Sequence, residues 1–235
     1  MKIAKTTLHN EALARIRDMV TEGQLEPGSK ISELKLCELF GISRTPVREA
    51  LKVLANEGML VLLPNRGARV AQVSAKDLGD LFRVVGTLEG LAGELACANI
   101  RDEALNEIRA LHHEMLAHHA RGDRAAYFRL NQAIHDAIFA AAGNGALSAM
   151  YERLRGRIRP ARFMANVTRE RWDEAVREHG QILDALMRRD GPRLREILKL
   201  HLEHKYLALA AVSAAAEGSS AREGGERPEP AKQLG

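Results

Sequence analysis

The sequence predicts a mainly α protein in two parts, an N-terminal winged helix-turn-helix with a small β-hairpin wing and then a six-helix antiparallel bundle. Three observations support this. A glycine-linked helix pair lies near the N-terminus, a short β-branched stretch follows it, and the pattern from residue 74 onward is helical. The chain has 235 residues, too many for one winged helix but enough for a winged helix and a larger helical domain. We place the first domain at residues 1–72 and the second at 73–216.

Two short helices joined through Gly41 form the predicted helix-turn-helix. The second begins at Ser43, a good N-cap residue, with Pro46 in the first turn, where its missing N–H costs nothing. Val47, Leu51 and Leu54 give it one apolar face. Its other face carries basic and hydroxyl side chains, namely Ser43, Arg44, Thr45, Arg48 and Lys52. This arrangement is typical of a recognition helix that reads double-stranded DNA.

A small hairpin is predicted directly after these helices. Residues 59–63 are apolar, residues 64–67 form a turn, and β-branched residues recur at Val70 and Val73. Arg66 and Gly67 lie at the tip, where a basic side chain and a close backbone suit the minor groove of DNA. A plain helical hairpin followed by a β-turn in another kind of domain is the alternative. The order of the elements favours the winged helix.

The second part of the chain is predicted to contain six helices with short connections. Hydroxyl, Asp and Gly residues at their ends place them at about residues 74–98, 102–122, 123–143, 145–166, 168–189 and 190–216. Pro160 is a candidate kink in the fourth of these helices. The remaining residues, 217–235, are rich in Gly, Glu, Ser, Pro and Arg and are predicted to be a disordered tail.

Histidines are the chemically distinctive residues of the bundle. Asn131 and His135 are four apart and share a face of the third bundle helix, while His179 and His201 lie on the fifth and sixth. Imidazoles and an amide oxygen converging from three helices would hold a divalent transition metal. From the spacing alone, hydrogen-bonded core or surface histidines are the simpler interpretation.

Charge and hydropathy point to a cytoplasmic protein. The net charge is +4, and residues 1–72 hold eleven Lys and Arg against eight Asp and Glu, an excess of three positive charges. A basic balance helps to bring a protein to DNA phosphates without giving specificity. No apolar run is long enough to span a bilayer, and no signal peptide is apparent, so we expect no membrane partner.

Residues 1–72 resemble the N-terminal domain of the GntR family of bacterial transcription regulators. The resemblance is carried by Pro27-Gly28, Ser32-Glu33, Phe40-Gly41-Ile42, the stretch from Ser43 to Leu51, Glu57-Gly58 and Arg66-Gly67. It implies that Ser43, Arg44, Thr45 and Arg48 approach the operator and that Gly67 touches the adjacent groove. Some members use an arginine at the position of Leu34, so that contact is absent here or is made by Lys35.

Residues 78–205 resemble the FCD domain, the effector-binding bundle of the FadR-like branch of that family. The matching residues are Leu88-Glu89, Leu95-Ala96, Asn131, His135, Glu178-His179, Asp190 and His201. The resemblance implies that Asn131, His135, His179 and His201 hold a metal ion, with Zn, Ni or Mn undecided, and that a small carboxylic acid binds beside it. Many relatives have aspartate at the position of Asn131, which weakens the metal prediction. The family precedent is a homodimer joined through the bundle.

An arginine that faces the pocket in many relatives is replaced here by Val85. Arg155, Arg159 and Arg162 share a face of the fourth bundle helix and could grip an effector carboxylate in two-point fashion. A solvated or salt-bridged basic face is the simpler interpretation of these arginines.

Two functions remain open at this point. The first is a ligand-responsive transcription regulator that binds a palindromic operator as a homodimer. The second is a metal-dependent hydrolase or lyase that uses the histidines. Hydrolysis requires a general base near the metal, and Glu178 points about 100° away from His179 around the helix. We therefore predict that the protein is not an enzyme.

Overall fold

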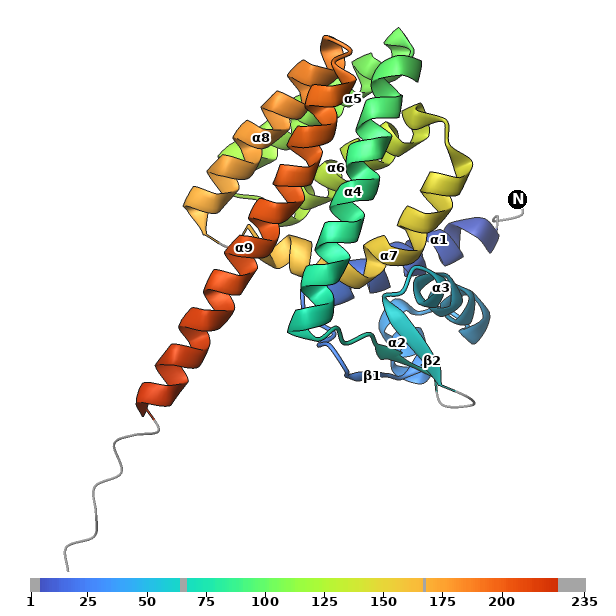
Figure 1. Cartoon of the computed structure of the whole chain (residues 1–235). Helices are drawn as coiled ribbons and strands as arrows, with labels where there is room; N and C mark the ends of the chain where they lie inside the picture. Colours follow the sequence, from blue (N-terminus) through green and yellow to red (C-terminus); the bar gives the residue numbers. More distant parts are fainter. Residues whose placement is uncertain (1–4, 64–66, 167, 224–235) are drawn as a thin grey trace, which may run out of the picture.

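The computed structural model describes residues 5–63, 67–166 and 168–223 and has the predicted mainly α architecture (Figure 1). The N-terminal part contains α1 (Lys5–Thr21), β1 (Lys30–Ile31), α2 (Glu33–Phe40), α3 (Arg44–Asn56), β2 (Leu60–Leu63) and β3 (Gly67–Val70). The bundle contains α4 (Ala75–Asn99), α5 (Asp102–Arg121), α6 (Arg124–Ala142), α7 (Gly145–Met164), α8 (Arg169–Met187) and α9 (Gly191–Glu223).

The helix-turn-helix is formed by α2 and α3, as predicted. Gly41 ends α2 in the left-handed conformation, with φ of 65°, and Ser43 occupies the N-cap position of α3. Val47, Leu51 and Leu54 are buried, as the apolar spacing of α3 requires. Their burial against α1, which contributes the fully buried Ile16, fixes the orientation of α3.

The wing is a three-stranded antiparallel sheet with strand order β1-β3-β2. Leu60 pairs with Val70 and Leu63 with Gly67, which gives the predicted hairpin. The third strand, β1, pairs Ile31 with Ala68 and has only two residues, too few for any periodic pattern to predict. The predicted hairpin tip at residues 64–66 lies outside the described residues.

The six helices from α4 to α9 correspond to the six predicted from the sequence. The side chains of Ser74, Asp123 and Thr168 each accept a hydrogen bond from the backbone N–H three residues later, so they cap α4, α6 and α8. The α7 helix continues through Pro160. None of the described helices has an apolar stretch long enough to cross a membrane.

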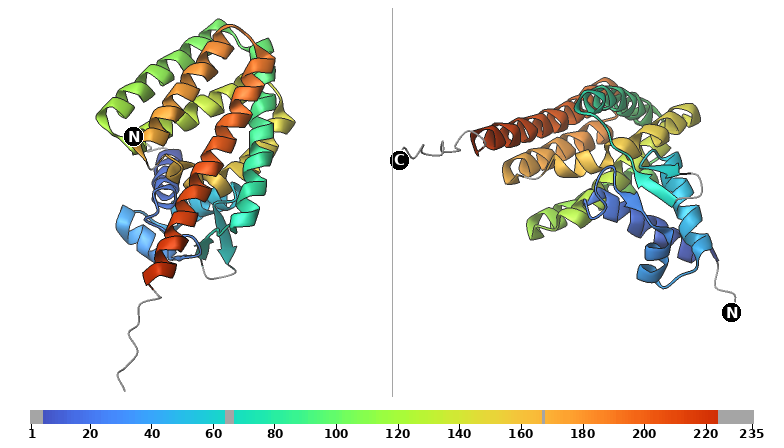
Figure 2. Two further views of the ribbon diagram at one scale, coloured as in Figure 1. Left: turned by 60° about the vertical axis from the view of Figure 1, so that its left-hand side comes forward. Right: turned by 90° about the horizontal axis from the view of Figure 1, so that it is seen from below.

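The last helix is longer than the sequence predicts. It continues past Ala216 to Glu223, so residues 217–223 are helical where we expected disorder, while residues 224–235 lie outside the described part of the chain. Figures 1 and 2 show α9 projecting well beyond its neighbours in the bundle. Helix propensity from the alanines before Glu217 carries the helix past the point where apolar spacing ends.

Close packing of α4 against α9 holds the bundle together (Figure 2). Glycines on α4 permit it, because a Cβ atom at Gly93 would lie 2.5 Å from Cδ1 of Leu198, and one at Gly90 would lie 2.9 Å from the carbonyl oxygen of Arg195. This packing gives the bundle its own buried apolar cluster, separate from the one that surrounds α3.

The N-terminal part meets the bundle along α7 (Figure 1). A Cβ atom at Gly156 would lie only 2.1 Å from the carbonyl oxygen of Glu57, so the turn after α3 rests directly on the α7 backbone. Arg159 donates a hydrogen bond to the Thr21 hydroxyl over 3.1 Å. The N-terminal part and the bundle are therefore joined by these contacts as well as by the linking chain.

Candidate functional site

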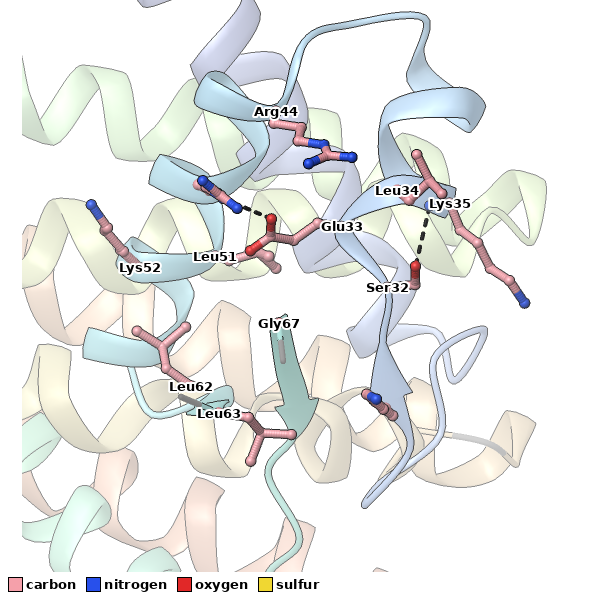
Figure 3. Close-up of a pocket in the computed structure, with 12 residues that line it drawn as sticks. Ser32, Glu33, Leu34, Lys35, Arg44, Leu51, Lys52, Leu62, Leu63 and Gly67 are labelled. Atoms are coloured by element: carbon pink, nitrogen blue, oxygen red, sulfur yellow. Dashed lines mark hydrogen bonds and ion pairs between the residues drawn. The ribbon is translucent and has the colours of Figure 1, made fainter. Parts of the chain in front are cut away.

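A basic hollow of about 800 Å³ lies between α2, α3 and the wing (Figure 3). Five of its lining residues are positive and one is negative, so it suits a polyanion. The lining residues are Lys30, Ser32, Glu33, Leu34, Lys35, Arg44, Arg48, Leu51, Lys52, Leu62, Leu63 and Gly67.

The basic side chains of α3 differ in how they are held. Nε of Arg48 donates to Oε2 of Glu33 over 2.7 Å, and Nζ of Lys52 donates to Oε1 of Glu49 over 2.7 Å. Arg44 has no side-chain partner within the described residues, and Figure 3 shows it extending between α3 and α2. Arg44 can therefore reach a ligand without first breaking an ion pair.

The predicted DNA-contacting residues divide into two groups in the structure. Arg44, Arg48, Lys52 and Gly67 line the basic hollow, whereas Ser43 and Thr45 line a second hollow beside Leu8 and His9 of α1. The Ser43 side chain makes no capping hydrogen bond, so its hydroxyl is available beside the start of α3, where backbone N–H groups favour phosphate. Arg66 lies outside the described residues.

Three of the four predicted metal ligands converge in the bundle. His135 of α6, His179 of α8 and His201 of α9 are buried, and one ring nitrogen from each lies within 4.8 Å of the others. Nitrogens that share one tetrahedral ion lie about 3.4 Å apart when each bond is about 2.1 Å long, so this spacing is somewhat wider than a closed site requires. Small side-chain rotations would bring all three nitrogens to one ion.

Two of these imidazole rings have a carboxylate oxygen beside Nδ1. Nδ1 of His201 lies 2.6 Å from Oε2 of Glu178, and Nδ1 of His135 lies 3.1 Å from Oε2 of Glu89. We assign the Nδ1–H tautomer to both rings from these contacts. Nε2 of each ring, with no hydrogen-bond partner in the described chain, is then a free lone pair. Carboxylate-backed imidazoles of this kind are the usual ligands of protein-bound zinc.

Burial keeps the histidines neutral. It lowers the pKa of His179 well below its ordinary value, and the neighbouring His201 and His135 lower it further. The pKa of His201 is also lowered well below the usual range, by burial and then by Lys205. Neutral imidazole is the form that binds a metal.

Asn131, the fourth predicted ligand, lies one turn before His135 and is completely buried. Neither its amide oxygen nor its amide nitrogen has a hydrogen-bond partner among the residues described. Unpaired buried amides are costly, so the amide oxygen is a plausible donor to an ion held by the histidines. This donor set fits a divalent transition metal.

Two further buried side chains surround the histidines. Arg162 donates to Oε1 of Glu89 over 2.5 Å, and the Tyr151 hydroxyl donates to the same oxygen over 3.3 Å. Although burial opposes its ionisation, Arg162 and then His135 hold the pKa of Glu89 well below its usual range. Lys205 is completely buried on α9, and its Nζ has no partner in the part of the chain described.

The three arginines predicted to bind an effector do not lie together. Arg162 pairs with Glu89, which touches His135. Arg155 instead pairs with Asp136 and with Glu152, the latter at 2.9 Å, and Arg159 binds Thr21 at the N-terminal part. The three arginines follow one another along α7, but each turn of this helix meets a different neighbour, so their side chains have different partners.

Sequence reasoning assigned no role in the site to Glu89 or Lys205. Lys205 follows His201 by four residues and so shares its helical face, a signal that was present in the sequence. Glu89 comes from α4, and nothing in its local pattern indicates that it reaches His135.

Two family models match this chain. Residues 8–70 match the model described as bacterial regulatory proteins, gntR family, and residues 80–204 match the FCD domain model. The second match alone covers more than half of the 235 residues.

Curated relatives and solved structures agree with these matches. A probable D-xylose utilization operon transcriptional repressor from Paenarthrobacter nicotinovorans is 31% identical over 90% of this chain and 92% of its own. The transcriptional repressor GlaR of Escherichia coli is 27% identical over 80% of this chain and 89% of its own. The E. coli McbR/YncC structure matches 88% of this chain and 98% of its own, with a TM-score of 0.76 and 24% identity, and so shares the fold. Transcription regulators, and not enzymes, are therefore the relatives of this chain, and the hydrolase alternative has no support.

Proposed function

This chain belongs to the GntR family of bacterial transcription regulators, in the FadR-like branch with an FCD domain, and we propose how such a regulator works here. It binds a palindromic operator as a homodimer through residues 1–72. A small carboxylate effector, bound at a metal site within residues 73–216, changes its affinity for the operator.

The proposed DNA surface is the start of α3 with the basic hollow. Arg44, Arg48 and Lys52 would contact bases and phosphates, while Ser43 and Thr45 would contact phosphate at the helix start. Gly67 would lie at the adjacent groove, and Arg66, outside the described residues, completes the proposed set. The proposal is supported by the excess of positive charge in the hollow.

The proposed metal ligands are His135, His179, His201 and Asn131, holding Zn, Ni or Mn. The observation that carries this proposal is the pairing of Nδ1 of His135 and of His201 with carboxylates, which leaves Nε2 of each ring without a partner. A bound ion would supply positive charge to which a carboxylate can be attracted. Within the bundle, Arg162 is retained as an effector contact because it touches Glu89, whereas Arg155 and Arg159 are engaged elsewhere.

Charge balance supports an anionic effector. Asn131 and three neutral imidazoles leave the ion's charge without compensation from its own ligands, so a carboxylate gains more here than beside an aspartate. Because coupling between two ligands is reciprocal, the carboxylate should also raise the affinity for metal. Calorimetry that finds equal metal affinity with and without a bound carboxylate would contradict this coupling.

Metal analysis together with operator binding tests the proposal. We expect about one transition metal per chain in the purified protein, and its loss in His179→Ala. Removing the ion should abolish any effect of acetate on operator binding while leaving binding itself intact. His113→Ala, which changes an exposed histidine of α5, is the matched control and should keep its metal. Full metal content in His179→Ala would remove His179 from the site.

A further inference from the structure

The unpaired polar atoms around the histidines fall into two chemical classes. Nε2 of His135 and of His201 and Oε2 of Glu89 are acceptors, which a cation can satisfy. Nε and Nη2 of Arg162 and Nζ of Lys205 carry only donors, which no cation can satisfy. A metal ion can therefore satisfy only the unpaired acceptors of this interior. The unpaired donors need a ligand that carries hydrogen-bond acceptors.

Lys205 is the group least explained by the protein itself. Its side chain is completely buried, and its Nζ has no partner within the described chain. Arg162 at least has Glu89 as a counter-ion at 2.5 Å. The other nearby acid, Glu178, already receives His201, His204 and Arg171. A buried ammonium without an ion-pair partner is strongly unfavourable unless something pairs with it.

We propose that Lys205, with the free guanidinium nitrogens of Arg162, is a second anchor for the effector, so that this site selects small dianions over monoanions. One charged group of the effector would face the histidine cluster, and the other would pair with Lys205. This inference rests on the proposed binding of an anion within the bundle. Dicarboxylic acids and phosphate monoesters share the required chemistry.

The electrostatics of the region support the placement. Burial lowers the pKa of Lys205 well below its ordinary value, and Arg162 and Arg171 lower it further, so the ammonium form is disfavoured here unless an anion is bound beside it. Lys205 follows His201 by four residues on the same face of α9, and it contributes to the lowered pKa of His135, His179 and His201. Glu89 is the one fully buried carboxylate among the described residues of this group: Arg162 pairs with its Oε1, and its Oε2 lies 3.1 Å from Nδ1 of His135.

The test is calorimetry on the full-length, metal-loaded protein, with acetate, succinate and inorganic phosphate as probes. We expect wild-type protein to bind succinate or phosphate at least about tenfold more tightly than acetate, since hydrogen bonds to charged groups contribute on that scale. Lys205→Met should remove this preference by lowering the affinity for succinate and phosphate at least about tenfold. Lys199→Met, on an exposed face of the same helix, is the matched control and should behave as wild type.

Folding of the variant is checked separately. Methionine is about as long as the buried part of lysine and needs no partner, so the Tm of metal-free Lys205→Met should equal or exceed that of wild type. Lys205→Gln, which keeps a donor without the charge, should show an intermediate preference. Tight binding of succinate alone, or of phosphate alone, would assign the site to that class of dianion and support the proposal.

Three results would overturn it. Equal affinity of wild-type protein for acetate and succinate, with acetate binding still dependent on metal, would contradict the second anchor while leaving the proposed function standing. Failure of every probe to bind would remove both the anchor and the effector site. Retention of the wild-type preference in a folded Lys205→Met would exclude Lys205.

Discussion

Glu178 shows how one side chain organises the bundle site without being a ligand. Its Oε2 lies 2.6 Å from Nδ1 of His201 and accepts from Arg171 over 2.9 Å, and its Oε1 lies 2.8 Å from Nδ1 of His204. The sequence placed Glu178 beside His179 only as an unsuitable general base. Its position away from His179 is what lets it reach α9 and fix the tautomer of His201.

Glu178→Gln should weaken metal binding without removing a ligand. The amide cannot hold the Nδ1–H of His201 as a carboxylate does, so we expect metal affinity to fall by roughly 10- to 100-fold. Competition with a chelator of known affinity measures this. Glu174→Gln, on an exposed position of the same helix, should leave the affinity unchanged. Equal chelator resistance in wild type and Glu178→Gln would show that this carboxylate does not tune the site.

Elements with a strong periodic pattern were predicted from the sequence, and elements defined by tertiary contacts were not. The six bundle helices and α3 follow from apolar spacing and capping residues such as Ser74 and Asp123. The two-residue strand β1 exists only because Ile31 pairs with Ala68 of the wing. The N-terminal helix α1 carries buried Ala12, Ile16 and Val20 at four-residue spacing, a signal that the sequence analysis did not use.

The same distinction holds for the candidate site: local sequence patterns predicted some of its residues, and tertiary packing determines the others. Helical spacing placed Asn131 and His135 on one helix face, and the family resemblance assigned them with His179 and His201 to a single site. The reach of Glu89 across from α4 and the burial of Lys205 depend on how α4 packs against α9. No local pattern encodes that packing. The separation of Arg155 and Arg159 from Arg162 has the same origin, because it depends on what lies beside each turn of α7.

A substitution on α7 tests whether this helix couples the two parts. In Gly156→Ala the new Cβ would lie 2.1 Å from the carbonyl oxygen of Glu57, so the turn after α3 must move. We expect operator affinity, or its response to acetate, to change while metal content stays the same.

The control lies on the same helix. A Cβ at Gly145 meets nothing within 4 Å, so Gly145→Ala should leave operator binding unchanged. Stability is measured alongside by thermal unfolding, because forcing the two parts to separate costs packing as well. Wild-type operator binding and response in a folded Gly156→Ala would show that this contact carries no coupling.

At the scale of the whole molecule, α7 spans the distance between the histidine site and the DNA-binding part. Arg162 near its end pairs with Glu89 beside His135, Arg159 one turn earlier binds Thr21, and Gly156 supports Glu57. An effector that engages Arg162 therefore acts on a rigid element whose other contacts lie on α1 and on the end of α3. Ligand binding can shift operator affinity only if the two arrangements of this element differ in effector affinity.

Arg44→Ala tests the proposed homodimer as well as the recognition helix. Each lost arginine contact should cost roughly 1–3 kcal/mol, and a dimer on a palindrome loses two of them. We therefore expect the free-energy loss on a complete operator to be about twice that on a single half-site. Arg193→Ala, an exposed arginine at the start of α9, makes the same charge change away from DNA and should have little effect.

Equal losses on the complete operator and the half-site would contradict two-fold binding. An unchanged operator affinity in a folded Arg44→Ala would contradict the assignment of α3 as the recognition helix. Both measurements need a fixed salt concentration, because phosphate contacts make affinity depend steeply on salt.

The contact at Gly156 also restricts which DNA-binding domains could replace residues 1–72 of this protein. An exchange of DNA-binding domains with its crossover near residues 71–74 would replace Glu57 and Gly58 but keep Gly156 on α7. The two parts also meet away from the linker. Gly58 fits between Arg153 and Arg157, and Gly156 fits against Glu57. A chimera would keep this contact only if its incoming domain also presents a glycine-ended helix to α7. Selecting donor domains by that turn, and not by linker length, is the practical rule that follows.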